Sequence, residues 1–321
     1  MRQISPIQVV CIGGGTGLPS LLTSLKDNPW LQLSALVNMF DTGGSSGELK
    51  DKFGTLPQGD VLKCVLALSE NTQEARDILL RRIRNPQYNG HTGGNILLLG
   101  LEKVYGSFSE AVVALSQLLS VKGTVIPITY EHSVLCARYT DGEVFKTETS
   151  VDVGIYEGKV VEKLYLEQSV SASDTALAAI RNAQVICLGP GSFYTSVLPN
   201  LLPDGVREAI VSSHAPIIYI TNLLTEGAGM QGCTVESLIH ILESYVGRSI
   251  AKAVVNTQVP SDEVLQQYAA ERKYPIICGS KDSTDERVVS ADLWTDNSIA
   301  RHDTKRLSCL VSSLITNLVN S

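Results

Sequence analysis

The sequence predicts an α/β fold, a doubly wound, mostly parallel sheet with a small β-hairpin insertion. Short apolar runs rich in Val and Ile alternate with longer amphipathic segments along the chain. This alternation is typical of parallel strands that are covered by helices on both faces. The insertion is predicted at residues 131–167, where the turn sequences DG and EGK separate β-favouring runs. Such a stretch should form two hairpins or a meander.

The near-continuous apolar runs are expected to be the buried strands of the sheet. In chain order they span residues 7–12, 33–39, 123–129, 184–189, 216–222, 251–256 and 275–279. Helical periodicity is found at residues 61–69, 74–83, 109–120, 173–183, 234–246 and 261–273. Ser173 and Ser261 open two of these segments, as N-cap residues do. No repeat or Pro/Gly-rich linker divides the chain, so we treat residues 1–321 as a single α/β domain.

Composition limits the class of protein. The chain has 321 residues, of which 44% are hydrophobic and 18% charged, as in soluble globular proteins. Its net charge of -7 and the lack of a Lys/Arg run argue against a nucleic-acid partner. The 7 cysteines occur singly, as buried thiols do in a reducing compartment. With no signal peptide or long apolar span, we expect a cytoplasmic protein without integral membrane contact.

The sequence GGGTG at residues 13–17 lies between the first strand and a helix start, where Pro19 is acceptable. It is not a dinucleotide fingerprint, because Leu18 stands where the last glycine would be, and it lacks the Gly-Lys of a P-loop. Two interpretations stay open. The loop is either a tight turn, or a set of N–H groups that attract an anion at a helix start.

Further glycine-rich loops favour the second interpretation. The sequences DTGGSSG, LPQGD, HTGGN and GPGSFYTS follow predicted strands or precede predicted helices. In an open parallel sheet, the loops after the strands gather along one edge, where ligands bind. Several converging groups of N–H donors would hold a pyrophosphate. We therefore expect these loops to form one anion-binding site.

Polar residues in these loops suggest contacts beyond phosphate. A sugar, a base or a hydrated Mg²⁺ could be held by Asn38, Asp41, Asp60, His91 and Asn95. Each has a structural alternative: an Asx-turn for Asp41, a helix N-cap for Asp60 and a turn-stabilising hydrogen bond for His91.

The loop after the fourth strand offers Ser192 and Thr195 as phosphate donors at a helix start, and Tyr194 as a ring face or hydroxyl. We find no spacing typical of a nucleophile triad or a metal cluster. His240 is expected to be an ordinary helix residue. The sequence therefore indicates binding more than catalysis.

Taken together, these motifs, with "LEQSVSASDTALAAI", "YITNLLTEGAG" and "ARHDTKRL", closely resemble the bacterial gluconeogenesis factor (YvcK) family. That family shares a superfamily with 2-phospho-L-lactate transferase (CofD). The resemblance implies a Rossmann-like fold and a cytoplasmic protein that binds UDP-sugars such as UDP-N-acetylglucosamine. It also implies a role linking gluconeogenic growth to cell-wall precursor supply and cell shape, with a homo-oligomer and a protein partner in cell-wall synthesis.

The resemblance also implies a ligand site. In this sequence it would comprise Gly13, Gly14, Gly15, Thr16, Gly17, Asn38, Asp41, Gly43, Gly44, Ser45, Ser46, Asp60, His91, Thr92, Gly93, Gly94, Asn95, Gly189, Gly191, Ser192, Tyr194, Thr195, Asn222, Tyr268 and Arg301. Arg301 is a candidate diphosphate clamp, and Tyr268 could stack on uracil or a sugar. Their structural alternatives are a surface salt bridge and a core contact.

Residues 226–230 depart from the family pattern, which usually has Thr-Gln-Pro-Gly-Glu-Thr after ITNLL, where this chain has TEGAGM. Two functions remain. The favoured one is a UDP-sugar sensor without catalysis that needs no cofactor. The alternative is an enzyme that moves a phospholactyl group from a nucleoside diphosphate donor to a deazaflavin alcohol, with Mg²⁺ held by Asp41 and Asp60. A nicotinamide dehydrogenase is a distant third, because the fingerprint fails at Leu18.

Overall fold

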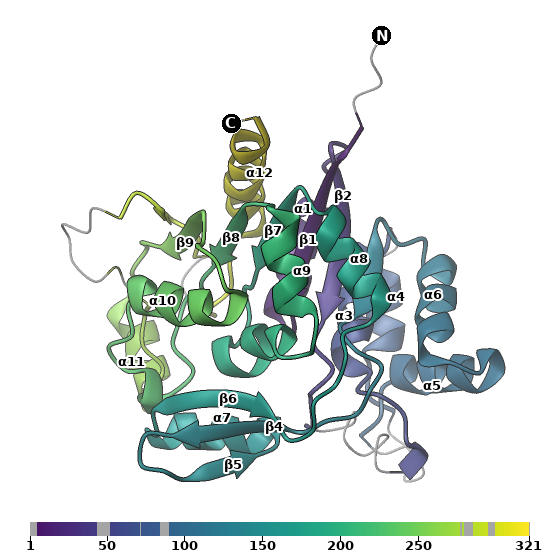
Figure 1. Ribbon diagram of the computed structural model, residues 1–321, viewed down its shortest axis with the longest axis horizontal. Helices are drawn as coiled ribbons and strands as arrows, with labels where there is room; N and C mark the ends of the chain where they lie inside the picture. The colour runs from purple at the N-terminus through teal and green to yellow at the C-terminus, as the bar shows by residue number, and fades with distance from the viewer. Residues whose placement is uncertain are drawn as a thin grey trace.

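A computed structural model describes residues 5–43, 52–70, 72–83, 90–276, 278, 285–294 and 299–320. Its centre is a parallel sheet with the strand order β10-β9-β8-β7-β1-β2-β3 (Figure 1). The strands are β1 (Ile7–Gly13), β2 (Leu31–Val37), β3 (Thr124–Pro127), β7 (Val185–Leu188), β8 (Ile217–Ile220), β9 (Lys252–Asn256) and β10 (Val288–Ala291). The predicted α/β fold is confirmed.

Strand β1 lies at the point where the strand order reverses. The chain builds β2 and β3 on one side of β1 and then returns to place β7 on the other side. This is the doubly wound, Rossmann-like arrangement, and its ligands bind at the carboxyl ends of the strands where the order reverses. All four residues of β7 and of β8 are buried, as expected for strands covered on both faces.

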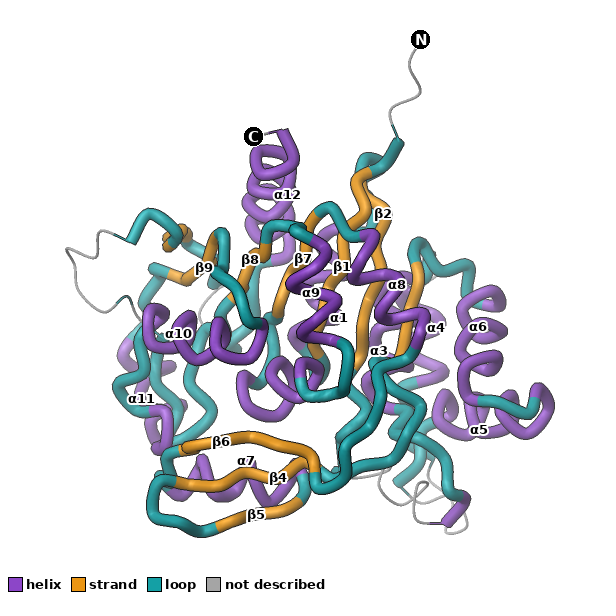
Figure 2. The backbone as a smooth tube through the Cα atoms, viewed as in Figure 1, coloured by secondary structure: helices purple, strands orange, loops and turns teal. Residues whose placement is uncertain are grey.

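Helices flank the sheet (Figure 2). One group packs together from α1 (Gly17–Leu25), α3 (Gly59–Leu68) and α12 (Thr304–Asn320), and α8 (Asp174–Asn182) packs against α9 (Val206–Ser213). The remaining α-helices are α4 (Thr72–Leu79), α5 (Gly93–Tyr105), α6 (Phe108–Leu118), α7 (Glu148–Glu157), α10 (Val235–Val246) and α11 (Asp262–Ala270). A π-helical turn, η1 (Phe193–Val197), leads into a short 3-10 segment, η2 (Leu198–Leu201). A second 3-10 segment, η3 (Ala228–Met230), follows β8.

The predicted β insertion is only partly a β structure. Strands β4 (Leu135–Tyr139), β5 (Val144–Lys146) and β6 (Val161–Leu166) form a small antiparallel sheet of order β5-β4-β6. Helix α7 lies between β5 and β6, where a further hairpin was predicted. The Thr147 side chain caps α7 by accepting from the Ser150 amide at 3.3 Å, and Gly158, with φ 103°, ends it. These capping residues and tertiary packing outweigh the β-branched residues within the segment.

The prediction of a strand at residues 275–279 is wrong for the part of this segment that the structure describes. Pro275 forms only an isolated bridge to Leu224. The edge position beside β9 is taken by β10, whose residues are half-buried or exposed. Because an edge strand needs no continuous apolar run, its sequence gave no such signal.

Two expectations from composition can also be compared with the structure. Cys11, Cys64, Cys136 and Cys187 are buried free thiols, whereas Cys233 and Cys278 are half-buried and Cys309 is exposed, which corrects the prediction for these three residues. Within the described ranges, no helix combines the length and apolarity needed to span a membrane.

Candidate functional site

A cavity of about 990 Å³ opens at the carboxyl ends of the central strands. Its lining comes from the loops after β1, β7 and β8, from α7 of the insertion and from the segment before α12. The cavity therefore lies beside the reversal point between β1 and β7, where doubly wound sheets bind ligands.

The glycines of the first loop allow two loops to cross in close contact. A Cβ atom on Gly17 would lie 2.3 Å from the Pro190 carbonyl oxygen, which belongs to the loop after β7. Gly15 has φ 63°, and its amide donates to Asp60 Oδ2 at 2.5 Å. Asp60 Oδ1 accepts from Lys63 at 2.9 Å. Asp60 is thus the residue that holds the first loop, and both of its oxygens are engaged.

The start of α1 is open to the cavity. Thr16, its N-cap residue, makes no capping hydrogen bond through its side chain, and the first turn carries no acidic residue. The amides of a first helical turn have no partner within the helix and attract anions. Here the Leu18 amide donates to the Gly14 carbonyl at 3.5 Å, and Pro19 has no N–H. The Thr16 and Gly17 amides are therefore the ones that face an anion. Thr16 and Gly17 both line the cavity, so this helix end can bind a phosphate group.

The start of η1 holds a carboxylate of the chain itself. The Phe193 amide donates to Glu226 Oε1 at 2.5 Å, and the Asn222 side chain donates to the same oxygen at 3.0 Å. Asn222 also accepts from the Gly191 amide at 2.9 Å. Burial raises the pKa of Glu226 to about 7, although the hydrogen bonds that its carboxylate accepts lower the pKa.

Helix α7 brings two more carboxylates to the cavity, Glu148 and Asp152. Burial raises the pKa of Glu148 to about 9, and the neighbouring Asp41 carboxylate adds to the shift. Burial also raises the pKa of Asp152, although the Thr195 hydroxyl donates to it at 3.0 Å. Glu148 is therefore protonated at neutral pH and can donate a hydrogen bond to the Asp41 side chain.

Basic side chains stand in the same lining. They are Lys63, Arg76, Lys273 and Arg301. Nearby, burial lowers the pKa of His302 to about 4, so its imidazole is neutral at physiological pH. The cavity thus offers cations and an open helix start to an anionic group, and carboxylates to hydroxyl or amide donors.

The predicted site residues fall into separate groups. Those that line the cavity are Gly15, Thr16, Gly17, Gly191, Ser192, Thr195, Asn222, Tyr268 and Arg301. Several others support its loops: Asn38 donates to the Thr195 carbonyl at 3.0 Å, and the Asn38 amide donates to the Gly13 carbonyl at 3.0 Å. Gly14 approaches Asp60, and Gly189 adopts φ 76° against the Ile220 carbonyl. Gly44, Ser45 and Ser46 lie outside the described residues.

Asp41 matches its structural alternative, because its Oδ1 accepts from the Gly43 amide at 2.7 Å, as in an Asx-turn. Asp60 is the second residue of α3 rather than its N-cap. Among the described residues, no three His, Cys, Asp or Glu side chains are grouped so that they could hold a metal ion. Mg²⁺ binding at Asp41 and Asp60 stays a prediction.

The segment from His91 to Asn95 lies outside the cavity lining. The Thr92 hydroxyl accepts from the Asn95 amide at 3.2 Å and caps α5. Gly94 packs against Leu62 so closely that a Cβ atom would lie 2.3 Å away. His91 is buried, with 5% of its surface exposed. These residues shape the contact between α5 and α3.

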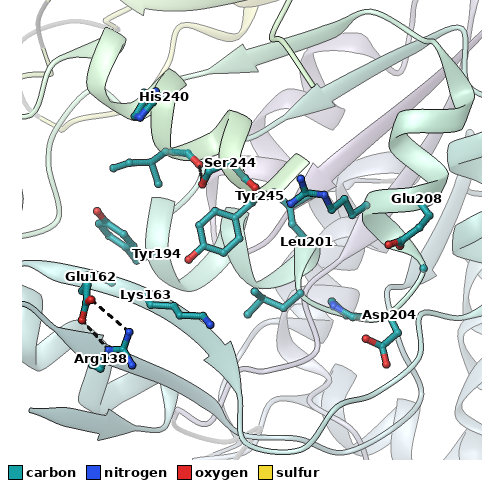
Figure 3. A pocket seen from close by; sticks show the side chains of 16 residues that line it. Arg138, Glu162, Lys163, Tyr194, Leu201, Asp204, Glu208, His240, Ser244 and Tyr245 are labelled. Carbon is teal, nitrogen blue, oxygen red and sulfur yellow. Dashed lines mark hydrogen bonds and ion pairs between the residues drawn. The ribbon is translucent and has the colours of Figure 1, made fainter. Parts of the chain in front are cut away.

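Tyr194 also differs from its neighbours in η1. Its side chain borders a separate cavity, beside Tyr245 (Figure 3), and His240 lines the same cavity. Ser192 and Thr195 face the first cavity. The π-helical turn therefore contributes side chains to two cavities.

Comparison with known proteins places the chain in a family. Residues 9–294 match the family described as 2-phospho-L-lactate transferase CofD. The chain belongs to the CofD family. Within it, this CofD-family chain is 32% identical to the "Gluconeogenesis factor" of Listeria monocytogenes, over 100% of this chain and 99% of that protein. It is 36% identical to the "Gluconeogenesis factor" of Halalkalibacterium halodurans, over 84% and 83% of the two chains.

A solved structure supports the same family. The crystal structure of a member of the upf0052 family from Bacillus halodurans superimposes with a TM-score of 0.89 at 32% sequence identity. The match covers 96% of this CofD-family chain and 99% of the other. The predicted resemblance to the gluconeogenesis factors and to CofD is thereby confirmed.

Several residues that line the cavity of this CofD-family chain were not predicted from the sequence. Glu148 and Asp152 come from α7, a helix that was predicted as β structure. Their signal was present, because a capping threonine at 147 precedes acidic residues four positions apart, and Gly158 follows at the helix end. Lys63 and Glu226 were not predicted as site residues, although Glu226 lies in the quoted sequence YITNLLTEGAG, and only the folded chain brings them to the cavity.

Proposed function

We propose that the chain is a regulatory factor that binds a nucleoside diphosphate sugar of the UDP-N-acetylglucosamine type in the cavity beside β1 and β7. In this proposal it links carbon metabolism during gluconeogenic growth to cell-wall precursor supply and cell shape. The name of the Listeria monocytogenes relative, gluconeogenesis factor, supports the first part of this role.

One observation carries the binding proposal. The uncapped start of α1 opens into the cavity at the reversal point of the sheet, with Gly15 and Gly17 as bare backbone in front of it. A diphosphate has the size and charge for such a helix start. Because Glu226 holds the amides at the start of η1, the diphosphate belongs at α1 and not at η1.

The other lining groups fit the two ends of such a ligand. Arg301 can clamp the diphosphate through two donors. Tyr268 is half-buried in the lining, and its hydroxyl accepts from the Ala300 amide at 2.7 Å. The exposed part of its ring can stack on a base or a sugar. Asp152 and Glu148 can accept hydrogen bonds from sugar hydroxyls or an amide.

Calorimetric titration with UDP-N-acetylglucosamine tests the proposal. We expect binding in the wild type, and at least a 10-fold weaker affinity, or about 1.4 kcal/mol, for Arg301→Ala, because one charged hydrogen-bonding group to the diphosphate is lost. Arg181→Ala, an exposed arginine on α8, is the matched control and should bind as the wild type does. Equal affinity of the two variants would remove Arg301 from the site, and no binding of any UDP-sugar would refute the proposal.

A second function is favoured by one observation. Glu148 lies against Asp41, so the fold forms a pair of acidic side chains. The loop after the second strand contains Asp41 as its acidic residue before Glu48, and the second member of this pair comes from α7. Such a pair could hold Mg²⁺ for a transferase of the phospholactyl type. Asp60 fits this role less well, because Gly15 and Lys63 engage both of its oxygens.

Incubation with a phospholactyl guanosine diphosphate donor, Mg²⁺ and a deazaflavin alcohol tests the transferase directly. The transferase proposal expects product that is lost in Glu148→Gln, with Glu157→Gln as the control at the other end of α7. Absence of turnover in protein that binds the nucleotide would favour the regulatory factor.

A further inference from the structure

The cavity that Tyr194 borders has no role in the proposed nucleotide-sugar site. It measures about 810 Å³ and lies between the small sheet and helices α9 and α10 (Figure 3). Strand β6, the turn before α9 and one side of α10 form its walls. Its volume is in the range of small-molecule sites. We name it the tyrosine groove, after Tyr194 and Tyr245.

Tyr194 is the most informative residue of the groove. Only 6% of its surface is exposed, and its side chain borders the groove. A phenol in such a wall offers an aromatic ring together with a hydroxyl that both donates and accepts hydrogen bonds. A molecule bound in the groove can therefore contact it.

A second tyrosine presents both a ring and a proton. The Tyr245 hydroxyl accepts from the Leu164 amide of β6 at 3.0 Å. A phenol that accepts one hydrogen bond still has its own proton to donate. Tyr194 and Tyr245 lie beside each other in the groove (Figure 3), so the groove offers aromatic surface together with hydroxyl groups.

The charged side chains around the tyrosines balance one another. Three are basic and three acidic: Arg138, Lys163, Arg207, Glu162, Asp204 and Glu208. Arg138 and Glu162 form a two-point ion pair, with distances of 2.7 and 3.3 Å. The side chains of Lys163 and Glu208 make no ion pair within the described part of the chain. A site for a strongly charged ligand would carry an excess of the opposite charge, and this groove has none.

We propose that the tyrosine groove binds an uncharged, hydroxyl-rich ring, that is, a mono- or disaccharide. Each hydroxyl of such a ring donates and accepts, so the ring needs partners of both kinds around it, and Lys163 and Glu208 provide a donor and an acceptor in the groove lining. The apolar C–H face of the ring packs on an aromatic side chain. This site is independent of the nucleotide-sugar site, from which it differs in its lining residues.

Ligand-observed NMR and calorimetry with glucose, N-acetylglucosamine and maltose test the proposal, with glucose 6-phosphate as the charged counterpart. We expect at least one neutral saccharide to bind, and glucose 6-phosphate to bind no more tightly than glucose. Tyr194→Phe and Glu208→Gln should each weaken binding about 2- to 10-fold, as expected for the loss of one hydrogen bond. Both changes keep the shape of the side chain, and an unchanged melting temperature shows that the fold is intact.

Lys146→Ala is the matched control, because Lys146 belongs to the same small sheet but pairs with Glu167 outside the groove. It should leave saccharide affinity unchanged. Saturating UDP should not displace the saccharide. The proposal is overturned if none of the neutral saccharides binds at about 50 mM, or if neither groove variant changes the affinity. Displacement by UDP would also overturn it, because the saccharide would then occupy the other cavity.

Discussion

Glu226 shows how a single ionisable residue can tune the cavity. Its carboxylate lies at the amides that begin η1, and burial brings its pKa to about 7. In the unfolded chain a glutamate titrates near pH 4.3. The folded protein therefore binds a proton more tightly than the unfolded chain. The stability conferred by the neutral form is fully present below about pH 4 and is lost as the pH rises through 7.

Glu226→Gln should therefore stabilise the protein at pH 8 and have little effect near pH 5, where Glu226 is mostly protonated. The amide oxygen of glutamine can still accept from the Phe193 amide and from Asn222, without a buried charge. Thermal melts at the two pH values measure the effect. Glu263→Gln, an exposed change in α11, should be neutral at both. A destabilised Glu226→Gln variant at pH 8 would show that the charge itself is needed.

The same residue should make ligand binding depend on pH. As the pH falls from 8 to 6, protonation of Glu226 removes a negative charge from the cavity, and the affinity for a UDP-sugar should rise. Glu226→Gln should flatten this dependence between pH 6 and 8. Calorimetric titrations at several pH values measure how the affinity changes with pH. The control variant Glu263→Gln should show the same pH dependence of UDP-sugar affinity as the wild type. An equally steep slope in Glu226→Gln would assign the dependence to another group.

Gly17 illustrates why the first loop is rich in glycine. A methyl group there would collide with the Pro190 backbone at 2.3 Å, and neither loop can move freely, because each follows a buried strand. Gly17→Ala should cost about 1–3 kcal/mol, the range for overpacking. Gly100→Ala in α5 is the matched control, since nothing lies within 4 Å of its Cβ position. That change should stabilise the protein by about 0.5–1 kcal/mol, and chemical denaturation measures both.

At the scale of secondary structure, the central elements could be predicted and the insertion could not. Strands such as β7 and β8 are buried on both faces, so their sequences are continuously apolar and easily recognised. Helix α7 has three β-branched or small residues in succession at 149–151 and a weak amphipathic pattern. Its existence depends on capping at Thr147 and on packing of Val151 and Ile155 against the small sheet. Tertiary contacts of this kind are not visible in a local pattern.

The position of α7 depends on one close contact. A Cβ atom on Gly154 would lie 2.3 Å from the hydroxyl oxygen of Tyr139, which itself donates to the Val151 carbonyl. Gly154→Ala should push α7 away from the small sheet, lower the stability and weaken UDP-sugar binding, because Glu148 and Asp152 would shift with the helix. Glu157→Ala, at the exposed end of α7, should stay within about 0.5 kcal/mol of the wild type. Unchanged ligand affinity in Gly154→Ala would show that α7 does not position the ligand.

At the scale of the whole molecule, the sequence could locate the edge of the sheet that carries the site but not the full set of loops. Residues 13–17 and 191–195 meet there because β1 and β7 are neighbours at the reversal point. The similar glycine sequence at 91–95 follows no strand of the large sheet and instead begins α5. Its glycines serve helix packing. A motif that looks the same in the sequence thus has a different role when the topology places it elsewhere.

This difference predicts which parts of the chain a ligand protects. A UDP-sugar at 100 times its dissociation constant should stabilise the folded state by about 2.7 kcal/mol, provided that it does not bind the unfolded chain. Hydrogen exchange should then slow most in the segments that line the cavity, which are residues 14–18, residues 191–196 and α7. It should slow least at residues 92–95 and in α6, which lie outside the lining. Exchange mass spectrometry with and without ligand measures this pattern. Strong protection confined to residues 91–95 would place the ligand at the start of α5, because only direct contact there could shield those amides while the α1 loop stayed open.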